Sequence, residues 1–251
     1  MALDDWLRAE HDELEIPINS AAERRAPLQR ERDIFRGMRV FILLLMSCAV
    51  LAAQENQQTW AFDSLTSIGG NAVKVLGDPK LIDTPAGKAV EFDGDGDALF
   101  FDVHPLAGAA SFTWEVIFRP DGDGAREQRF FHLQENGSQN RLMFESRVLE
   151  GGWYLDAFAN SGESKPLMVP EKLHPADRWY HIAQVYDGSE YRSYVNGELQ
   201  MAAPLKLKPQ GEGRTSAGVR INLVDYFKGA IRLARFSRRA LSPAEFLPPP
   251  K

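Results

Sequence analysis

Residues Arg178–Leu199 read RWYHIAQVYDGSEYRSYVNGEL. The stretch contains two short segments rich in aromatic and β-branched residues, and each segment runs into a turn. Asp187-Gly188 follows the first segment, and Asn196-Gly197 follows the second. Both residues of the Asn-Gly pair tolerate the positive φ of a two-residue type I′ turn. This pattern is typical of antiparallel hairpins.

The same pattern of short apolar segments separated by turn residues extends from Gln54 to the end of the chain. Apolar segments alternate with clusters of Gly, Asp, Asn and Pro, and none has a period of 3.6 residues over three turns. The single helical signal is Ser242-Pro243, a capping residue followed by a residue suited to the first helical position. We predict an antiparallel β-sandwich with strands at Thr59–Asp63, Lys88–Asp93, Ala98–Val103, Ser111–Arg119, Gln128–Gln134, Arg141–Arg147, Trp153–Ala159, Trp179–Tyr186, Tyr191–Val195, Val219–Leu223 and Ala230–Phe236.

Alternation along these strands assigns side chains to the core. One face of Ser111–Arg119 is wholly apolar and must be core, namely Phe112, Trp114, Val116 and Phe118. In the next hairpin we expect the inward side chains to be Trp179, His181, Ala183 and Val185, with His181 a hydrogen-bonded structural imidazole. The apolar residues of Ala230–Phe236 change phase, which indicates a strand near a sheet edge.

The composition and net charge limit which kinds of molecule the protein is expected to bind. The 251 residues are 44% hydrophobic and 25% charged, which is ordinary for a soluble globular domain. The net charge of −6 argues against nucleic acid, because phosphate binding needs a concentrated basic surface. The single cysteine, Cys48, leaves no intramolecular disulfide.

An export segment precedes the predicted domain. Residues 38–53 contain Arg39, the apolar run Val40–Leu51 and small residues that suit cleavage. The alternatives are an uncleaved anchor, the one case in which we expect a membrane partner, and a lipoprotein signal at Cys48. Residues 1–37 are charged, and we interpret them as a disordered leader or an early-assigned start. Residues 54–251 then form the folded domain, exported to the periplasm, the cell surface or the medium.

Four segments in order resemble one family: GKAVEFDGDGDAL (Gly87–Leu99), SFTWEVIFRP (Ser111–Pro120), RWYHIAQVYDGSEYRSYVNGEL (Arg178–Leu199) and YFKGAIRLARFSRRALSPAEF (Tyr226–Phe246). Together they are similar to LamG-like, concanavalin A-type jelly-roll domains of secreted and cell-surface proteins. The resemblance implies two stacked, curved antiparallel sheets. It also implies a binding role for carbohydrate or a glycosylated surface.

An acidic loop is the candidate metal site. Asp93, Asp95 and Asp97 alternate with glycines, and calcium takes six to eight oxygen ligands, which such a loop can help supply. Many relatives in the resembled family bind calcium at loops near the sandwich rim. Calcium is therefore the candidate cofactor. The alternative is an ordinary solvated turn, where Asp and Gly are common.

A set of polar side chains is the candidate carbohydrate site. If they face away from the core, these residues share an open sheet face that carries charged groups and an aromatic ring: Glu115, Arg141, Glu145, Arg147, Tyr154 and Asp156. Trp153 is a further candidate for stacking on a sugar, whereas Trp60, Trp114 and Trp179 are expected in the core. The alternative is a solvated face with cross-strand ion pairs.

The sequence motifs of related catalytic domains are absent or incomplete. The E-x-D-x-x-E string of related glycosidases is absent, because Gly96 follows Glu91-Phe92-Asp93 where the second glutamate is needed. Tyr226-Phe227-Lys228 approaches a lyase string without its partner motifs. We therefore predict an exported, non-catalytic binding module for a glycan or glycoprotein surface. A divergent polysaccharide-cleaving enzyme and a structural or adhesive domain with protein partners are the alternatives.

Overall fold

The computed structural model describes residues 56–250. The predicted leader (1–37), the export segment (38–53) and Cys48 lie outside the described residues. Within the described range, no helix has the length and apolarity needed to cross a membrane. The elements are β1 (Gln57–Ala61), β2 (Ser67–Ile68), β3 (Asn71–Ala72), β4 (Lys74–Leu76), β5 (Lys80–Thr84), β6 (Gly87–Asp93), β7 (Ala98–Phe101), β8 (Phe112–Pro120), β9 (Glu127–Glu135), β10 (Arg141–Leu149), β11 (Gly152–Ser161), β12 (Glu163–Met168), β13 (Tyr180–Tyr186), β14 (Glu190–Val195), β15 (Glu198–Pro204), β16 (Gly213–Ala217), β17 (Lys228–Ser237) and the 3₁₀ turn η1 (Pro243–Glu245).

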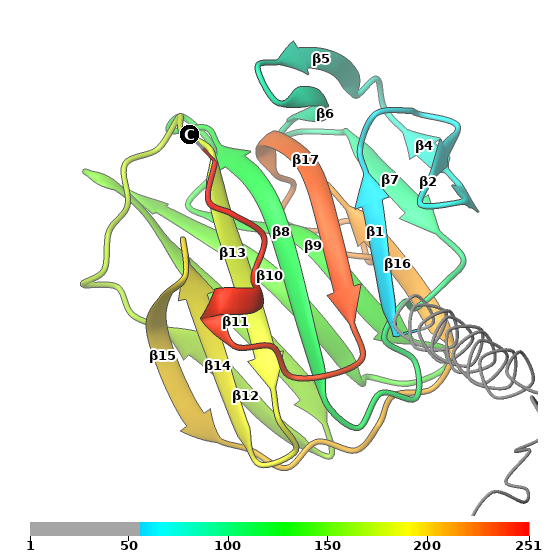
Figure 1. The fold of residues 1–251 in the computed structure, drawn as a ribbon. Coiled ribbons are helices and arrows are strands. Elements are labelled where there is room, and N and C mark those ends of the chain that lie inside the picture. Colours follow the sequence, from blue (N-terminus) through cyan, green and yellow to red (C-terminus); the bar gives the residue numbers. More distant parts are fainter. Residues whose placement is uncertain (1–55, 251) are drawn as a thin grey trace, which may run out of the picture. The chain divides into compact units, whose positions relative to one another are not determined.

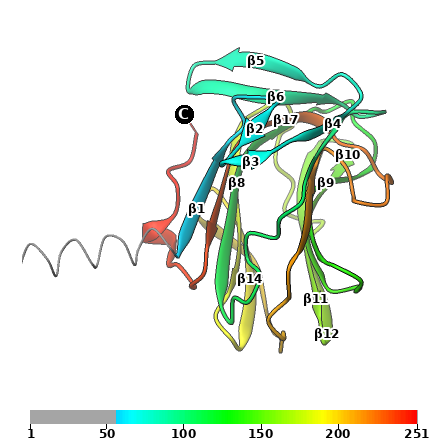
Figure 2. The same cartoon turned by 90° about the vertical axis from the view of Figure 1, so that its right-hand side faces the viewer.

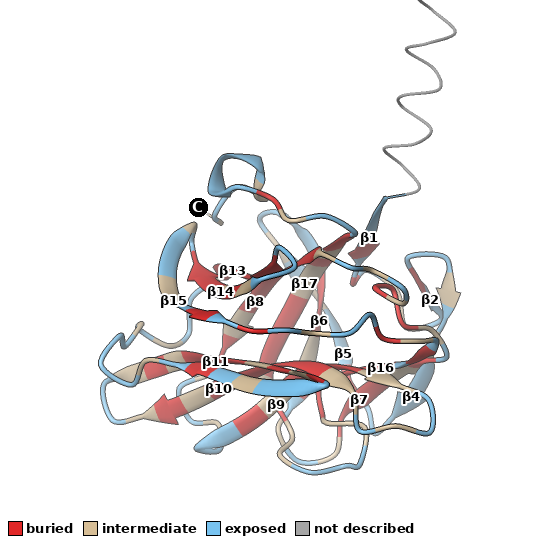
Figure 3. Cartoon of the chain, turned by 90° about the horizontal axis from the view of Figure 1, so that it is seen from below, coloured by how far each residue is buried: buried red, intermediate tan, exposed pale blue. Residues whose placement is uncertain are grey.

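Two antiparallel sheets lie face to face and confirm the predicted sandwich (Figures 2 and 3). The 8-stranded sheet has the order β15-β14-β13-β8-β17-β6-β5, with β1 also paired to β17. The 7-stranded sheet has the order β12-β11-β10-β9-β16-β7-β4, and β2 and β3 form a small ribbon. The Asn196-Gly197 turn between β14 and β15 has φ values of 50° and 81°, as a type I′ turn requires.

The core lies between the two sheets and is rich in aromatic rings. Trp60 and Trp114 are fully buried there, as the sequence predicts. Phe118 of β8 stacks on Phe130 of β9 with ring centroids 4.5 Å apart, so the contact joins the two sheets. Each such ring removed from water contributes about 1.5–3 kcal/mol to folding. The predicted inward face of β8 is confirmed.

Strand β13 corrects the predicted face assignment. All of Tyr180–Tyr186 is buried, and it is Tyr180, Ile182 and Tyr186 that enter the core between the sheets. His181 is buried on the opposite side of the strand. Trp179 precedes the strand, is only half-buried, and lies under the guanidinium of Arg119 at 5.9 Å. Alternation fails here because both faces of β13 are covered, so neither face is marked by solvated polar residues.

The outer side of β13 is covered by residues 242–250, which we call the C-terminal strap. Figure 1 shows this segment (red) crossing in front of β8 and β13. Phe246 of the strap packs on Ala183, Val185 and Tyr194. The predicted helical signal corresponds to η1, where Ser242 and Glu245 form a capping box. The strap thus explains why a strand with no solvent face exists in this sheet.

Strand β17 is central rather than near an edge, which corrects the prediction. It lies between β8 and β6, and the change of phase comes from a register shift between Ile231 and Leu233. A β-bulge of this kind turns the following side chains to the other face. The predicted strand Val219–Leu223 is instead part of the loop between β16 and β17, and Leu223 has a φ of 61°.

Candidate functional site

The candidate site lies on the side of the 7-stranded sheet that faces away from the other sheet, which we call the outer face. On β10, Leu142, Phe144 and Val148 enter the core, so the odd-numbered residues between them face outward. Register then matches Glu145 with Asp156 and Arg147 with Tyr154 on β11. Five of the six predicted site residues therefore share this face: Arg141, Glu145, Arg147, Tyr154 and Asp156.

Two arginines bind the carboxylates of this face into one network. Nη2 of Arg147 donates to Glu145 Oε2 at 3.1 Å and to Asp156 Oδ2 at 2.8 Å. Nε of Arg129, from β9, donates to the same Glu145 oxygen at 3.2 Å and its guanidinium also pairs with Asp225. Only 4% of the Glu145 side chain and 3% of the Asp156 side chain are exposed. The expectation that Glu145 and Arg147 are solvent-side groups is therefore wrong for Glu145, which is a buried carboxylate.

Burial changes the acidity of both carboxylates. The pKa of Glu145 is raised, chiefly by burial and then by the neighbouring charge of Asp156, although Arg129 and Arg147 oppose the shift. The pKa of Asp156 is also raised by burial, against the hydrogen bond from Arg147. Oδ1 of Asp156 is buried without a hydrogen-bond partner. The arginines thus offset, but do not cancel, the cost of placing two carboxylates side by side.

Residues 218–227, which we call the 218–227 loop, cover the β9 part of the outer face. Its ends are joined, because the N–H of Phe227 donates to the carbonyl of Gly218 at 2.8 Å. Gly218 has a φ of +88°, and a Cβ there would lie 2.4 Å from the ring of Phe92, so the loop needs glycine at this point. The N–H of Ile221 donates to Nδ1 of His132 at 3.1 Å. This contact fixes the loop over the sheet.

Beside Tyr154, the outer face carries a second aromatic residue, which is Phe158 and not Trp153. The guanidinium of Arg141 lies over the Phe158 ring, 4.7 Å from its centroid. Trp153 is fully buried and packs edge-on against Phe118 at 5.0 Å, so it cannot stack on a ligand in this arrangement. The prediction of Trp153 as a stacking residue is wrong, because its position in β11 has the parity of the core.

Glu115 does not join the other predicted site residues. It lies on the 8-stranded sheet, fully buried under the C-terminal strap, where Oε1 is 3.0 Å from Nε2 of His181 and accepts the N–H of Leu247 at 2.7 Å. Arg235 pairs with the other carboxylate oxygen. Burial opposes ionisation, yet the hydrogen bonds from His181 and Arg235 outweigh it and lower the pKa of Glu115. Glu115 is therefore a structural anchor for the strap, and its assignment to the open face is corrected.

The predicted calcium loop forms a turn in which the carboxylates of Asp93 and Asp97 accept backbone N–H groups. Oδ1 of Asp93 accepts the N–H groups of Asp95, Gly96 and Asp97 at 2.9, 3.0 and 3.2 Å. Asp97 accepts the N–H groups of Asp78 and Asp93. Among residues 56–250, no group of three or more His, Cys, Asp or Glu side chains is placed to hold a metal ion. Calcium binding at this loop stays a prediction.

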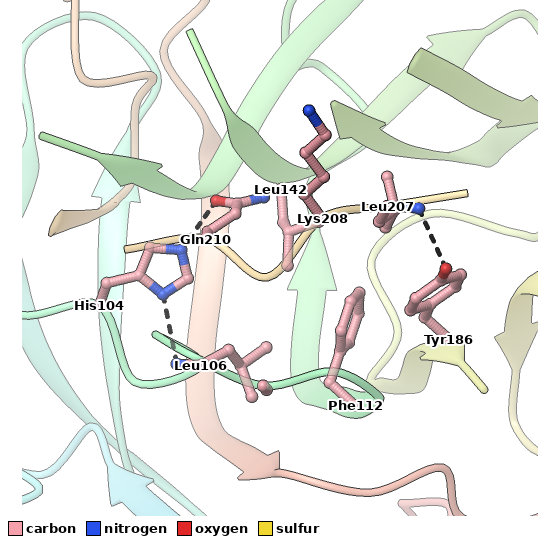
Figure 4. A pocket seen from close by; sticks show the side chains of 9 residues that line it. His104, Leu106, Phe112, Leu142, Tyr186, Leu207, Lys208 and Gln210 are labelled. Atoms are coloured by element: carbon pink, nitrogen blue, oxygen red, sulfur yellow. Dashed lines mark hydrogen bonds between the residues drawn. The ribbon is translucent and has the colours of Figure 1, made fainter. Parts of the chain in front are cut away.

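A small cavity between the ends of the two sheets is shown in Figure 4. His104 lies at its edge, and its Nε2 is 3.0 Å from Oε1 of Gln210 while its Nδ1 accepts the N–H of Leu106 at 3.2 Å. The hydroxyl of Tyr186 accepts the N–H of Leu207 at 3.0 Å. These polar groups are already paired inside the protein. The cavity therefore has a structural role and is not a candidate binding site.

The geometry places polar and aromatic side chains on one face of a two-sheet jelly roll, and sequence comparison agrees with that fold. A family model described as "Concanavalin A-like lectin/glucanases superfamily" matches residues 93–246, which is more than half of the chain. The chain belongs to this superfamily. No curated protein sequence matches this superfamily member.

Solved structures of the same fold include carbohydrate-related and toxin domains. Domain 4 of AbnA, an extracellular arabinanase of Geobacillus stearothermophilus solved with arabinotriose, is 17% identical with a TM-score of 0.55, and the match covers 75% of this chain and 94% of that one. The binding domain of Paraclostridial Mosquitocidal Protein 1 is 13% identical with a TM-score of 0.58 (77% and 51% covered). The botulinum neurotoxin type G receptor-binding domain is 12% identical with a TM-score of 0.56 (75% and 49% covered). The superfamily member thus spans about half of the two toxin domains, and these likenesses show the fold.

Sequence reasoning missed several residues of this superfamily member's outer face. Arg129 lies within a predicted strand, but nothing in its sequence context separates it from an ordinary surface arginine. The predicted strand at Val219–Leu223 hides the loop position of Arg220, and Asp225 follows that range with no signal of its own. Phe158 alone had a usable signal, since period-2 alternation from Tyr154 places it on the same face.

Proposed function

We propose that the described domain is part of an exported, non-catalytic binding module that recognises a carbohydrate or a glycosylated surface through the outer face of the 7-stranded sheet. The observation that carries the proposal is the convergence of Arg141, Arg147, Tyr154 and Phe158 on one face of adjacent strands. Sugar sites combine directional hydrogen-bonding groups with an aromatic surface. Here both are present on the same hairpin.

The outer face is also held in place before any ligand arrives. Arg147 is fixed by three carboxylates, from Glu127, Glu145 and Asp156, and Arg141 is fixed against Phe158. Side chains that are already ordered lose little entropy on binding, so a preorganised face binds more tightly than a mobile one. The likeness in fold to an arabinanase domain solved with arabinotriose supports a carbohydrate as the ligand.

A polysaccharide-cleaving enzyme is the second candidate, and one observation favours it. Glu145 and Asp156 are adjacent carboxylates whose pKa values are both raised, and a raised pKa is what a general acid requires. However, both carboxylates are buried, and one oxygen of each is held by Arg129 or Arg147. We therefore place these carboxylates in the framework of the face rather than in a reaction.

The test is binding of the purified protein to a glycan array and to insoluble polysaccharides, with parallel assays for cleavage products. We expect a subset of glycans to bind without being cleaved, and Phe158→Ala to weaken binding at least tenfold while the fold is retained. The matched control is Leu81→Ala, an exposed apolar residue on the other sheet. If no glycan binds, or if both variants bind like the parent, the proposal fails. Release of shorter products would favour the enzyme instead.

A further inference from the structure

Three arginines on one part of the outer face lack a carboxylate partner. Among the ion pairs of residues 56–250, none involves Arg141, Arg214 or Arg220. By contrast, Arg129 and Arg147 on the same sheet are each bound to acidic groups. In a protein with a net charge of −6, a local group of unpaired arginines is unexpected from composition alone. We call these three residues the arginine cluster.

Strand register brings the cluster together. Arg141 of β10 and Arg214 of β16 are both paired with Gln134 of β9, the strand between them. Arg141, Gln134 and Arg214 therefore form one row across the sheet. The next outward residue of β9 is His132, which accepts the N–H of Ile221 and so places Arg220 beside the row. Two inter-strand steps separate the Cα atoms of Arg141 and Arg214 by about 10 Å.

The charges of this part of the face act on one another. Burial lowers the pKa of Arg141, and the nearby charge of Arg220 lowers it further. The pKa of His132 is lowered to about 3 by burial and then by Arg220, Arg141 and Arg129, so this imidazole is neutral at physiological pH. Among residues 56–250, Glu145 is the carboxylate that counters the repulsion at both Arg141 and Arg220, and it is already bound by Arg129.

Hydrogen-bond donors without partners point to a missing acceptor. Nε of Arg141 is buried and has no hydrogen-bond partner. His132 accepts at Nδ1, so its proton is on Nε2, and that donor is also unpartnered. A buried donor left without an acceptor costs about 1–3 kcal/mol. An oxyanion bound at this place would relieve both the repulsion and the lack of acceptors.

We propose that the arginine cluster binds the carboxylate or sulfate groups of an acidic polysaccharide, an inference that rests on the glycan-binding function proposed above. Arginine suits these groups because its planar guanidinium can donate two parallel hydrogen bonds to one oxyanion. The spacing across three strands favours a polymer with repeated charges over a single small anion.

Apolar surface beside the cluster fits the rings of such a polymer. Phe158 lies under Arg141, and Arg214 lines an open depression with Phe100, Ile221 and Leu223. Sugar rings pack on apolar and aromatic surfaces while their charged substituents reach the arginines. Nucleic acid also carries repeated anions, but the overall negative charge of the protein opposes it.

The experiment uses the full protein and matched pairs of polymers, each acidic polymer paired with its neutralised form. The pairs are polygalacturonate with its methyl ester, a sulfated glycan with its desulfated form, and a sialylated glycan with its carboxyl-reduced form. We expect at least one acidic member to bind at least tenfold more tightly than its partner, and added salt to weaken that binding. Arg141→Gln combined with Arg220→Gln should remove the preference, while Arg238→Gln, an exposed residue after β17, should not.

The outcomes separate this inference from the proposed function. If neutral forms bind as well as acidic forms, the inference is wrong and glycan binding stands. If no polymer binds, glycan binding itself fails. Equal binding of inorganic sulfate or of single-stranded DNA would also overturn the inference, because neither carries the sugar rings. Melting curves of both variants confirm that a change in binding is not a loss of fold.

Discussion

Arg147→Ala tests whether the outer-face carboxylates depend on their arginines. Asp156 has Arg147 as the ion-pair partner in the described structure, whereas Glu145 also has Arg129. Removing one partner of a buried ion pair costs about 3–5 kcal/mol, and the lower end applies because Glu145 keeps a partner. We therefore expect the free energy of unfolding to fall by about 3 kcal/mol at pH 8. For a domain of this size the melting temperature should fall by about 6–12 °C.

The pH dependence makes this prediction specific. The pKa values of Glu145 and Asp156 are already raised in the folded state, so stability from their protonated forms is present at low pH and is lost as pH rises through the folded pKa values. Without Arg147 both pKa values should rise further. The loss caused by Arg147→Ala should therefore be smaller at pH 5 than at pH 8.

Urea unfolding at the two pH values, followed by tryptophan fluorescence, measures the effect. Asp156→Asn added to Arg147→Ala should recover part of the lost stability, because the amide carries no charge to leave unpaired. The exposed Arg238→Ala serves as the control for losing an arginine. A loss below about 0.5 kcal/mol at pH 8, the size typical of surface substitutions, would refute the buried network, as would equal losses at both pH values.

Three further outcomes are expected. Trp179→Ala should lower the free energy of unfolding by only about 1 kcal/mol, because the ring is half-buried against a cation. Trp114→Ala in the core should lower it by about 3–5 kcal/mol. Similar losses for the two variants in urea unfolding would contradict the core assignment. Chelation by EDTA should leave the melting temperature unchanged, because the carboxylates of Asp93 and Asp97 accept backbone N–H groups, and a clear fall would support the calcium prediction. Phe246→Ala should speed amide hydrogen exchange in β13 more than in β10, and equal exchange in the parent and the variant would show that the strap does not protect the sheet.

The sequence predicts features that depend on local alternation and fails where two distant segments meet. Glu145, Arg147 and Asp156 were correctly grouped because one hairpin fixes their parity and register. Glu115 also has an outward parity, but alternation cannot tell which of two sheets a strand joins. For the same reason the partners of Glu115, namely His181 and the strap, could not be predicted from local pattern.

Irregular backbone accounts for the other differences. The bulge between Ile231 and Leu233 changes the phase of β17 without a glycine or proline to mark it. Leu223 and Asp225 have positive φ values. A positive φ is uncommon for leucine, so the sequence does not predict it. The sequence therefore predicts a strand where Arg220 lies on a loop, and the arginine cluster depends on the register of β9 and β16, which the local pattern does not fix.

The central place of β17 has a consequence for synthesis. It is the last strand of the described chain, yet it joins β8 on one side to β6 and β1 on the other. Until residue 237 has been made, the 8-stranded sheet exists in three parts, namely β15-β14-β13-β8, β6-β5 and β1, with unpaired edges that can pair with other chains. The pairing of β1 with β17 spans more than 160 residues of the chain. A nascent chain therefore gains little stability by folding before β17 has been made. Partners that shield unfolded chains would be most needed during this interval.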